Sequence, residues 1–148
     1  MDISTGMPAM TGLIFADTNL VLYTIGKDDR KKAIAREILA GRPVVSVQVI
    51  NEAVNVCLRR FAFTRERAYA FADILMRRTA IRPLDEATIR KSAEIAIRCR
   101  FSNWDSLIIA AALLANCDTL YSEDMQHGQI IDGTLTWAWR HVRHYAEI

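Results

Sequence analysis

Four acidic side chains, far apart in the chain, each lie beside an apolar segment that a folded protein would bury. They are, in chain order, Asp17, Glu52, Asp105 and Asp124. An ionised carboxylate beside buried apolar segments is costly unless something pairs with it. A divalent cation held by several carboxylates would supply that pairing, and it would also give the protein a reaction to catalyse.

Asp17 and Asp124 each follow a short strand-like run. Asp17 comes directly after residues 13–16, and Asp124 follows the run that ends at Ser122. The alternatives are a helix cap for Asp17 and an ordinary polar loop for Asp124, because both are common. Glu123 is the lesser candidate, since Ser122 and Asp124 would project to the same side if the strand continued.

Glu52 and Asp105 lie on helical segments with apolar surroundings. Glu52 shares a helix face with Val49 and Val56, so it lies along an apolar stripe. Asp105 begins a helix that is apolar all round over residues 107–115, which predicts that this helix is buried. The alternatives are an ion pair with an arginine for Glu52 and a favourable interaction with the helix dipole for Asp105.

Mg²⁺ and Mn²⁺ prefer oxygen ligands, and they would offset the repulsion between neighbouring carboxylates. A water bound to such an ion becomes a stronger nucleophile, and the ion stabilises charge on a phosphoryl oxygen. The predicted reaction is therefore hydrolysis of a phosphodiester by a metal-activated water. A zinc site is not predicted, because His127, His141 and His144 lack matching cysteines. The chain also has no glycine-rich phosphate loop.

The elements expected around the four acids alternate between strands and helices. Strands are expected over residues 13–16, 44–45, 80–83, 119–122 and near 135–139, and helices over 18–25, 29–40, 47–60, 65–78, 86–98 and from 103 onward. This alternation predicts a parallel sheet covered on both faces. Ligands of such sheets bind beyond the carboxyl ends of the strands, where Asp17, Glu52 and Asp124 are expected.

The length of 148 residues predicts one domain over residues 13–148, preceded by a flexible leader over residues 1–12. No apolar run is long enough for a membrane helix, so no membrane partner is expected. The three cysteines, Cys57, Cys99 and Cys117, are each expected as a buried reduced thiol in a cytoplasmic protein.

The basic residues are unevenly distributed. Residues 56–104 hold eleven Arg or Lys against five Asp or Glu, and the whole chain has fifteen Arg against four Lys. Arginine binds phosphate in a bidentate manner, which suits a nucleic-acid partner. A solvated helix surface explains the same charges equally well.

Four segments together resemble the PIN domain, in its VapC-like toxin branch. They are residues 15–19, 46–52, 104–112 and 120–128, and the match covers roughly residues 13–132. The resemblance implies a compact three-layer α/β/α domain with a mainly parallel central sheet. It also implies a Mg²⁺- or Mn²⁺-dependent ribonuclease. Asp17, Glu52, Asp105 and Asp124 would be its metal-binding and catalytic cluster, and Asn19 and Ser122 would be polar support.

Toxins of this branch form homodimers, and a cognate antitoxin neutralises them by wrapping its C-terminal segment over the acidic groove. Their substrates are structured RNAs, often tRNA or ribosomal RNA cut at a defined loop. This chain departs from the branch at its ends. Residues 1–12 precede the expected start, and a segment with Trp137 and Trp139 replaces the usual C-terminal ending.

Two other hypotheses remain open from the sequence. One is a non-catalytic PIN-like module that binds RNA or protein without cutting it. The other is a phosphoryl-transfer receiver or phosphatase with Asp17 as the nucleophile. That hypothesis requires a lysine near the carboxyl ends of the strands. The four lysines all lie on polar helical stretches: Lys27, Lys31, Lys32 and Lys91.

Overall fold

The computed structural model describes residues 12–123, 130–131 and 135–137. It contains the alternating strands and helices that the sequence predicts. The expected leader up to residue 11, Asp124 and Trp139 lie outside the described residues.

Within the described residues, a six-stranded sheet forms the centre of the fold, in the order β3-β2-β1-β4-β6-β5. Its strands are β1 (Ile14–Ala16), β2 (Val44–Ser46), β3 (Ala80–Arg82), β4 (Thr119–Tyr121), β5 (Ile130–Ile131) and β6 (Leu135–Trp137). All neighbours from β3 to β6 are parallel, and β5 pairs antiparallel with β6. The sheet is therefore mainly parallel, as predicted. The short strand β5 was not predicted, because two residues are too few to show an alternating pattern.

The helices begin where the sequence offers a capping side chain. They are α1 (Thr18–Tyr23), α2 (Asp29–Ala40), α3 (Val47–Arg59), α4 (Arg65–Arg78), α5 (Glu86–Cys99) and α6 (Asn103–Leu114). Their N-caps are Asp17, Asp28, Ser46, Thr64, Asp85 and Ser102, and each accepts a hydrogen bond from a backbone N–H of the first turn. Such caps satisfy donors that have no partner inside the helix.

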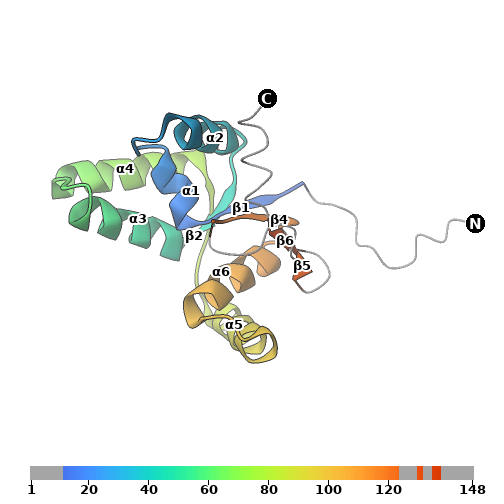
Figure 1. Cartoon of the computed structure of the whole chain (residues 1–148). Coiled ribbons are helices and arrows are strands. Elements are labelled where there is room, and N and C mark those ends of the chain that lie inside the picture. The colour runs from blue at the N-terminus through green and yellow to red at the C-terminus, as the bar shows by residue number, and fades with distance from the viewer. Residues whose placement is uncertain (1–11, 124–129, 132–134, 138–148) are drawn as a thin grey trace, which may run out of the picture.

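The helices form layers on the two faces of the sheet. Figure 1 shows α5 and α6 below the sheet and α1 and α2 above it, with the pair α3 and α4 extending beyond the end of β2. The arrangement is the expected three-layer α/β/α fold. It leaves the carboxyl ends of β1, β2 and β4 next to the starts of α1 and α3, which follow β1 and β2 directly.

The core lies where the two helical layers meet the sheet. Phe15 and Leu120 in adjacent central strands and Ile109 in α6 have no exposed surface. The prediction that α6 is buried is therefore confirmed over its middle turns, from Ile108 to Ala112. Burying such side chains removes apolar surface from water, which is the main term that holds the layers together.

The prediction that all three cysteines are buried is wrong for Cys99. Cys57 and Cys117 are buried, but Cys99 is exposed. Cys99 is the last residue of α5, one turn beyond Ile95, the last buried position of that helix. Its apolar sequence context therefore continues past the part of the helix that packs on the protein.

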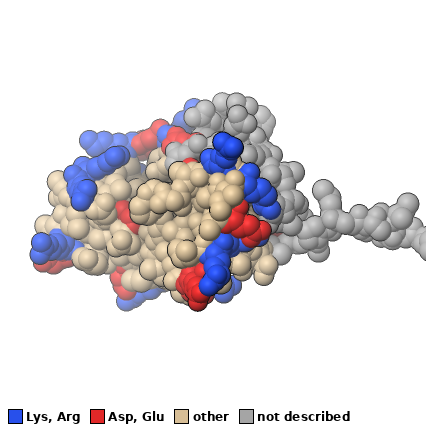
Figure 2. Space-filling view, turned by 90° about the horizontal axis from the view of Figure 1, so that it is seen from below, with Lys and Arg blue, Asp and Glu red and all other residues tan. Residues whose placement is uncertain are grey.

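Basic and acidic side chains are interspersed on the face that carries α5 and α6. Figure 2 views the molecule from this side and shows both signs around a broad uncharged area. Arg90 pairs with Glu86 one turn earlier on α5, and Lys91 pairs with Glu94. Exposed pairs of this kind contribute little to stability. For α5, the basic composition thus reflects a solvated helix surface.

Among the described residues, no helix is both long and apolar enough to cross a membrane.

The difference between core and surface can be tested with one residue type. We expect Ile109→Ala to lower the free energy of unfolding by about 2–5 kcal/mol, because Ile109 has no exposed surface and its truncation leaves a cavity. Ile97 is 81% exposed on α5, so Ile97→Ala should change it by less than about 0.5 kcal/mol. Urea denaturation followed by circular dichroism measures both values, and similar losses for the two variants would contradict this description of the core.

The three thiols should differ in reactivity. Burial, and to a lesser extent the nearby Asp118 carboxylate, raises the pKa of the Cys117 thiol to about 12. Burial also raises the pKa of Cys57. Because the thiolate is the reactive form, alkylation of the native protein at mildly basic pH should modify Cys99 alone. Mass spectrometry should find one label in the native protein and three after unfolding. Equal labelling of Cys57 or Cys117 in the native state would contradict the described burial.

Candidate active site

Asp17 is held at the carboxyl end of the central strand β1. Its side chain is 6% exposed. One carboxylate oxygen, Oδ1, accepts from the backbone N–H of Thr18 at 2.6 Å, and the other, Oδ2, accepts from the Ser122 hydroxyl at 2.7 Å. Its backbone N–H donates to the carbonyl of Tyr121 at 3.1 Å. The carboxylate is thus anchored to both β1 and β4, with donors that offset the cost of burying it.

Glu52 approaches from α3 and is held by two donors. Its Oε2 accepts from the Thr18 hydroxyl at 2.6 Å, and its Oε1 accepts from Nε2 of Gln48 at 3.2 Å. Gln48 lies one turn earlier on the same helix face, so the second contact is local to α3. The alternative of an ion pair with arginine is not found for Glu52 among the described residues.

Thr18 joins the two carboxylates. Its backbone N–H donates to Asp17, its hydroxyl donates to Glu52, and its side chain is buried. Asp17 and Glu52 come from separate parts of the sequence and are therefore linked through one residue, at the carboxyl ends of β1 and β2. Two like charges held close to one another repel, and the site offsets this repulsion with hydrogen-bond donors from Thr18, Gln48 and Ser122.

Asp105 lies in the first turn of α6, half-buried, and its backbone N–H donates to the Ser102 hydroxyl at 3.1 Å. The C-terminal end of α6 lies near the start of β4, because only four residues separate Leu114 from Thr119. A helix of 12 residues is about 18 Å long, so its first turn lies toward the opposite, carboxyl side of the strands. Asp105 thus lies toward the same edge of the sheet, at the carboxyl ends of the strands, as Asp17 and Glu52.

The two expected supporting residues have different surroundings. Ser122 donates to Asp17, as described. Asn19, half-buried in α1, lines a pocket between α1, α2 and α3. Asp124 lies outside the described residues, so its place remains a prediction.

Glu123 contacts the first two helices, α1 and α2. Its carboxylate accepts from the Tyr23 hydroxyl and pairs with Nζ of Lys31 at 3.1 Å. These contacts balance the charge of Glu123, and the choice of Asp124 over Glu123 stays a prediction. They also correct the expectation that no lysine lies near the carboxyl ends of the strands. Lys31 lies on a polar stretch of α2, but the packing of α2 on α1 brings it to the loop after β4.

The donor chemistry of the site suits a hard cation, because every candidate ligand offers carboxylate oxygen. Each oxygen of Asp17 and Glu52 accepts at least one hydrogen bond, and a carboxylate oxygen has two lone pairs. In their present positions, however, no three acidic, histidine or cysteine side chains among the described residues surround an ion-sized space. The structure therefore brings Asp17 and Glu52 together and places Asp105 toward the same edge of the sheet. The described acids do not form a complete metal-binding group.

Sequence reasoning missed Gln48 and Ser106 as candidate site residues. Both are buried, and Oε1 of Gln48 and Oγ of Ser106 have no hydrogen-bond partner among the described residues. Gln48 precedes Glu52 by four positions and Ser106 follows Asp105 directly, so the spacing held a signal for each. The contact between Tyr23, Lys31 and Glu123 had no such signal, because it joins three separate elements.

The family model of the PIN domain matches residues 14–130. No curated protein sequence matches the chain.

Solved structures share the fold at low identity. VapBC2 from Rickettsia felis, bound to a DNA fragment from its promoter, is 21% identical, with a TM-score of 0.64 over 85% of this chain and 97% of that chain. VapC20 from Mycobacterium tuberculosis, a sarcin–ricin loop cleaving toxin, is 20% identical, with a TM-score of 0.61 over 75% and 89%. A toxin–antitoxin complex from Klebsiella pneumoniae is 18% identical, with a TM-score of 0.62 over 84% and 96%. At these identities the likeness concerns the fold.

The anchoring of Asp17 by Ser122 can be measured with a double-mutant cycle. We expect Ser122→Ala to lower the free energy of unfolding at neutral pH by about 1.5–3 kcal/mol, because a buried carboxylate loses a donor. In an Asp17→Asn background, the same change should cost only about 0.5–1.5 kcal/mol, since the acceptor is then a neutral amide. Urea denaturation gives the four values, and equal losses in both backgrounds would contradict a charge-assisted contact.

Proposed function

Because the chain belongs to the PIN domain family, which its sequence matches over residues 14–130, we propose that it is a metal-dependent RNA endonuclease. We further propose that it is the toxin component of a toxin–antitoxin pair. The cofactor is Mg²⁺ or Mn²⁺, held by Asp17, Glu52, Asp105 and Asp124.

One observation carries this proposal: Thr18 holds the carboxylates of Asp17 and Glu52 together at the carboxyl ends of the central strands. In open α/β sheets, this edge is where ligands bind. A purely structural pair of acids would be expected to have a basic partner, but the described partners of Glu52 are neutral donors. Neutral donors leave the negative charge of Glu52 available to a cation.

The chain's own residues position the carboxylates and, with them, the scissile phosphate. Thr18 and Gln48 fix Glu52, and Ser122 fixes Asp17, so that both acids are held before substrate binds. When bound, Mg²⁺ or Mn²⁺ would make water a stronger nucleophile and stabilise charge on the phosphoryl oxygens. Hydrolysis adds water across a P–O bond of the RNA backbone and yields two shorter strands.

The proposed partners follow from the structural neighbours, several of which are toxin–antitoxin complexes. We propose a cognate antitoxin that covers the acidic site and a homodimer of this chain as the assembled toxin. The RNA substrate is structured, with tRNA and ribosomal RNA as the leading classes. One neighbour is described as a toxin that cleaves the sarcin–ricin loop.

The proposal can be tested on RNA cleavage by the pure protein and in cells. We expect Asp17→Asn and Glu52→Gln each to lower the cleavage rate at least about 100-fold, because each removes a cation ligand. EDTA should abolish cleavage by the wild type, and Mg²⁺ or Mn²⁺ should restore it. Induced expression followed by mapping of new RNA 5′ ends identifies the substrate, since a specific cut should appear with wild type only.

Glu37→Gln is the matched control, because Glu37 is exposed on α2 and should not affect the rate. Undiminished cleavage by both site variants would rule out the acid site. A protein that binds RNA equally well with Mg²⁺ or EDTA and yields no product would instead be the non-catalytic module.

A further inference from the structure

A pocket of about 310 Å³ opens between α1, the start of α2 and the end of α3. We propose that it binds one unpaired nucleotide of the RNA strand next to the cleavage site. Arg60 and Lys27 bind its phosphate, and Phe61 stacks on its base. This inference rests on the proposed function, because it assigns a specificity subsite to the same enzyme.

The charged side chains that line the pocket are mainly cationic. Lys27, Lys31 and Arg60 line it, against a single carboxylate, that of Asp28. Asp28 caps α2, where its Oδ1 accepts from the backbone N–H groups of Arg30 and Lys31 at 3.1 Å each. In the part of the chain that the structure describes, neither Lys27 nor Arg60 pairs with a carboxylate. These two side chains therefore offer positive charge to an anion in the pocket.

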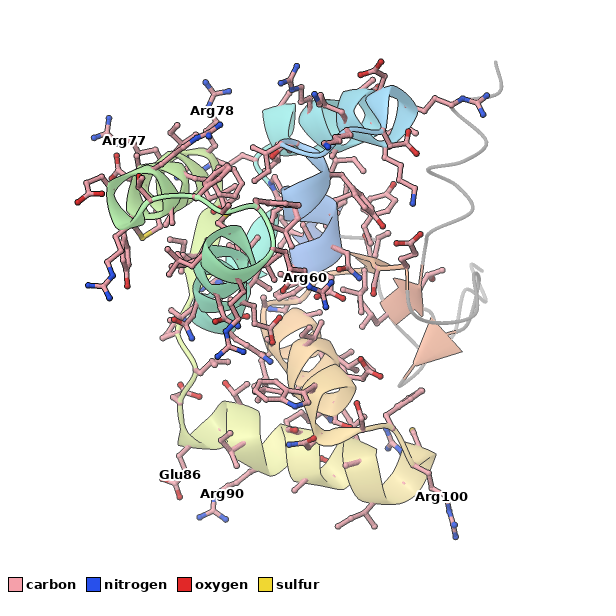
Figure 3. All side chains as sticks on the ribbon, turned by 60° about the vertical axis from the view of Figure 1, so that its left-hand side comes forward. Arg60, Arg77, Arg78, Glu86, Arg90 and Arg100 are labelled. Carbon is pink, nitrogen blue, oxygen red and sulfur yellow. The ribbon has the colours of Figure 1, made fainter. Side chains whose placement is uncertain are left out.

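Arg60 lines this space and is also exposed to solvent. Figure 3 shows it between the ribbons of α3 and α1, whereas Arg77 and Arg78 extend outward from the end of α4. Arg60 is the C-cap residue of α3, and its backbone N–H is bonded to the carbonyl of Val56. Its guanidinium offers the planar donor pattern that suits phosphate.

An aromatic side chain lies beside these cations. Phe61 lines the pocket and is 39% exposed. It packs on Phe63, with ring centroids 6.1 Å apart, and the residue between them, Ala62, has a φ of 52°, a conformation that non-glycine residues rarely adopt. A partly exposed ring that is held in place beside cations is the arrangement that stacks on an unpaired base.

The opposite wall is fixed by its own contacts. Nζ of Lys31 lies 4.8 Å from the centroid of the Tyr23 ring and pairs with Glu123, which also accepts from the Tyr23 hydroxyl. The charge of Lys31 is thus balanced within the protein. Lys27 and Arg60 carry the net attraction for phosphate, and Tyr23 forms a preorganised side of the pocket.

The pocket and the acid pair share the helices α1 and α3. Glu52, Val56 and Arg60 are spaced by four residues on one face of α3, and the last two line the pocket. Eight residues of helix place Arg60 about 12 Å from Glu52. Asn19, two residues after Asp17, also lines the pocket. A strand with its scissile phosphate at the acids therefore reaches the pocket within a short length.

Size and polarity favour a single nucleotide over a duplex or a peptide. A volume of about 310 Å³ lies at the lower end of the range for small-molecule sites, which is about 300–1,000 Å³. A-form duplexes are contacted across wide grooves, whereas unpaired bases enter pockets and stack there. The cationic lining opposes basic peptide side chains and attracts phosphate.

The test is RNA binding in EDTA, so that it does not depend on cleavage. The probe is a fluorescent single-stranded RNA of mixed sequence, about ten nucleotides long. Fluorescence anisotropy measures Kd for the full chain from about 50 to 200 mM salt. Arg60→Ala and Phe61→Ala are compared with Arg59→Ala and Tyr69→Ala, since Arg59 and Tyr69 are exposed and do not line the pocket.

Arg60→Ala should weaken binding about tenfold and lower the slope of log K against log salt by about 0.7, the loss of one phosphate contact on a single strand. Phe61→Ala should weaken binding about tenfold or more and leave the slope unchanged, because stacking releases no counterion. The two control variants should stay within about twofold of wild type.

Absence of wild-type binding, or wild-type affinity in both pocket variants, would overturn the inference. The inference would also be overturned if Arg60→Ala and Phe61→Ala weakened binding of a protein partner and left RNA binding unchanged, because the pocket would then bind a peptide. The RNA-binding results are independent of the test of the proposed nuclease function. Cleavage that survives Asp17→Asn would end the nuclease proposal, while the anisotropy data would still decide the pocket.

Discussion

The hydrogen bonds of Thr18 to Asp17 and Glu52 set the geometry on which the site depends. Two carboxylates resist being brought together at the edge of an apolar core, and donors must be supplied from the protein itself. Thr18 can donate to both because it follows the end of β1 and begins α1. Ser122 adds β4 to this network through its bond to Asp17. The central strands and α3 thus converge on one small polar site.

The parallel sheet explains why the convergence occurs at that edge. Strands β1, β2 and β4 run in the same direction, so the residues that follow them meet at their carboxyl ends. The orientation of α6, which returns to the start of β4, places Asp105 toward the same edge of the sheet. A negative site and a cationic pocket then lie next to each other, joined by α1 and α3. This separation of charge suits a cation at one position and a phosphate at the next.

Fold alone does not establish an activity, because one fold hosts many functions. The surroundings of the acids give more specific information about the site. The described partners of Glu52 are neutral donors, and Glu123 is taken up by Tyr23 and Lys31. These contacts distinguish Glu52, which has neutral partners, from Glu123, whose charge is balanced by Lys31. The basic residues divide in the same way, because Arg90 pairs along α5 whereas Arg60 lines the pocket.

The sequence by itself determined the alternation of elements, the capping residues and the parallel sheet, because period, caps and short apolar runs are local signals. It also indicated Asp17 and Glu52, each beside an apolar segment. It misjudged Cys99, because an apolar context does not say where a helix overhangs its support. Only the tertiary structure decided that Thr18 joins two acids and that Lys31 reaches Glu123. It alone also assembled Arg60, Phe61 and Lys27 around one pocket. Those contacts depend on how α1, α2 and α3 pack, and no local pattern encodes the distance between separate elements.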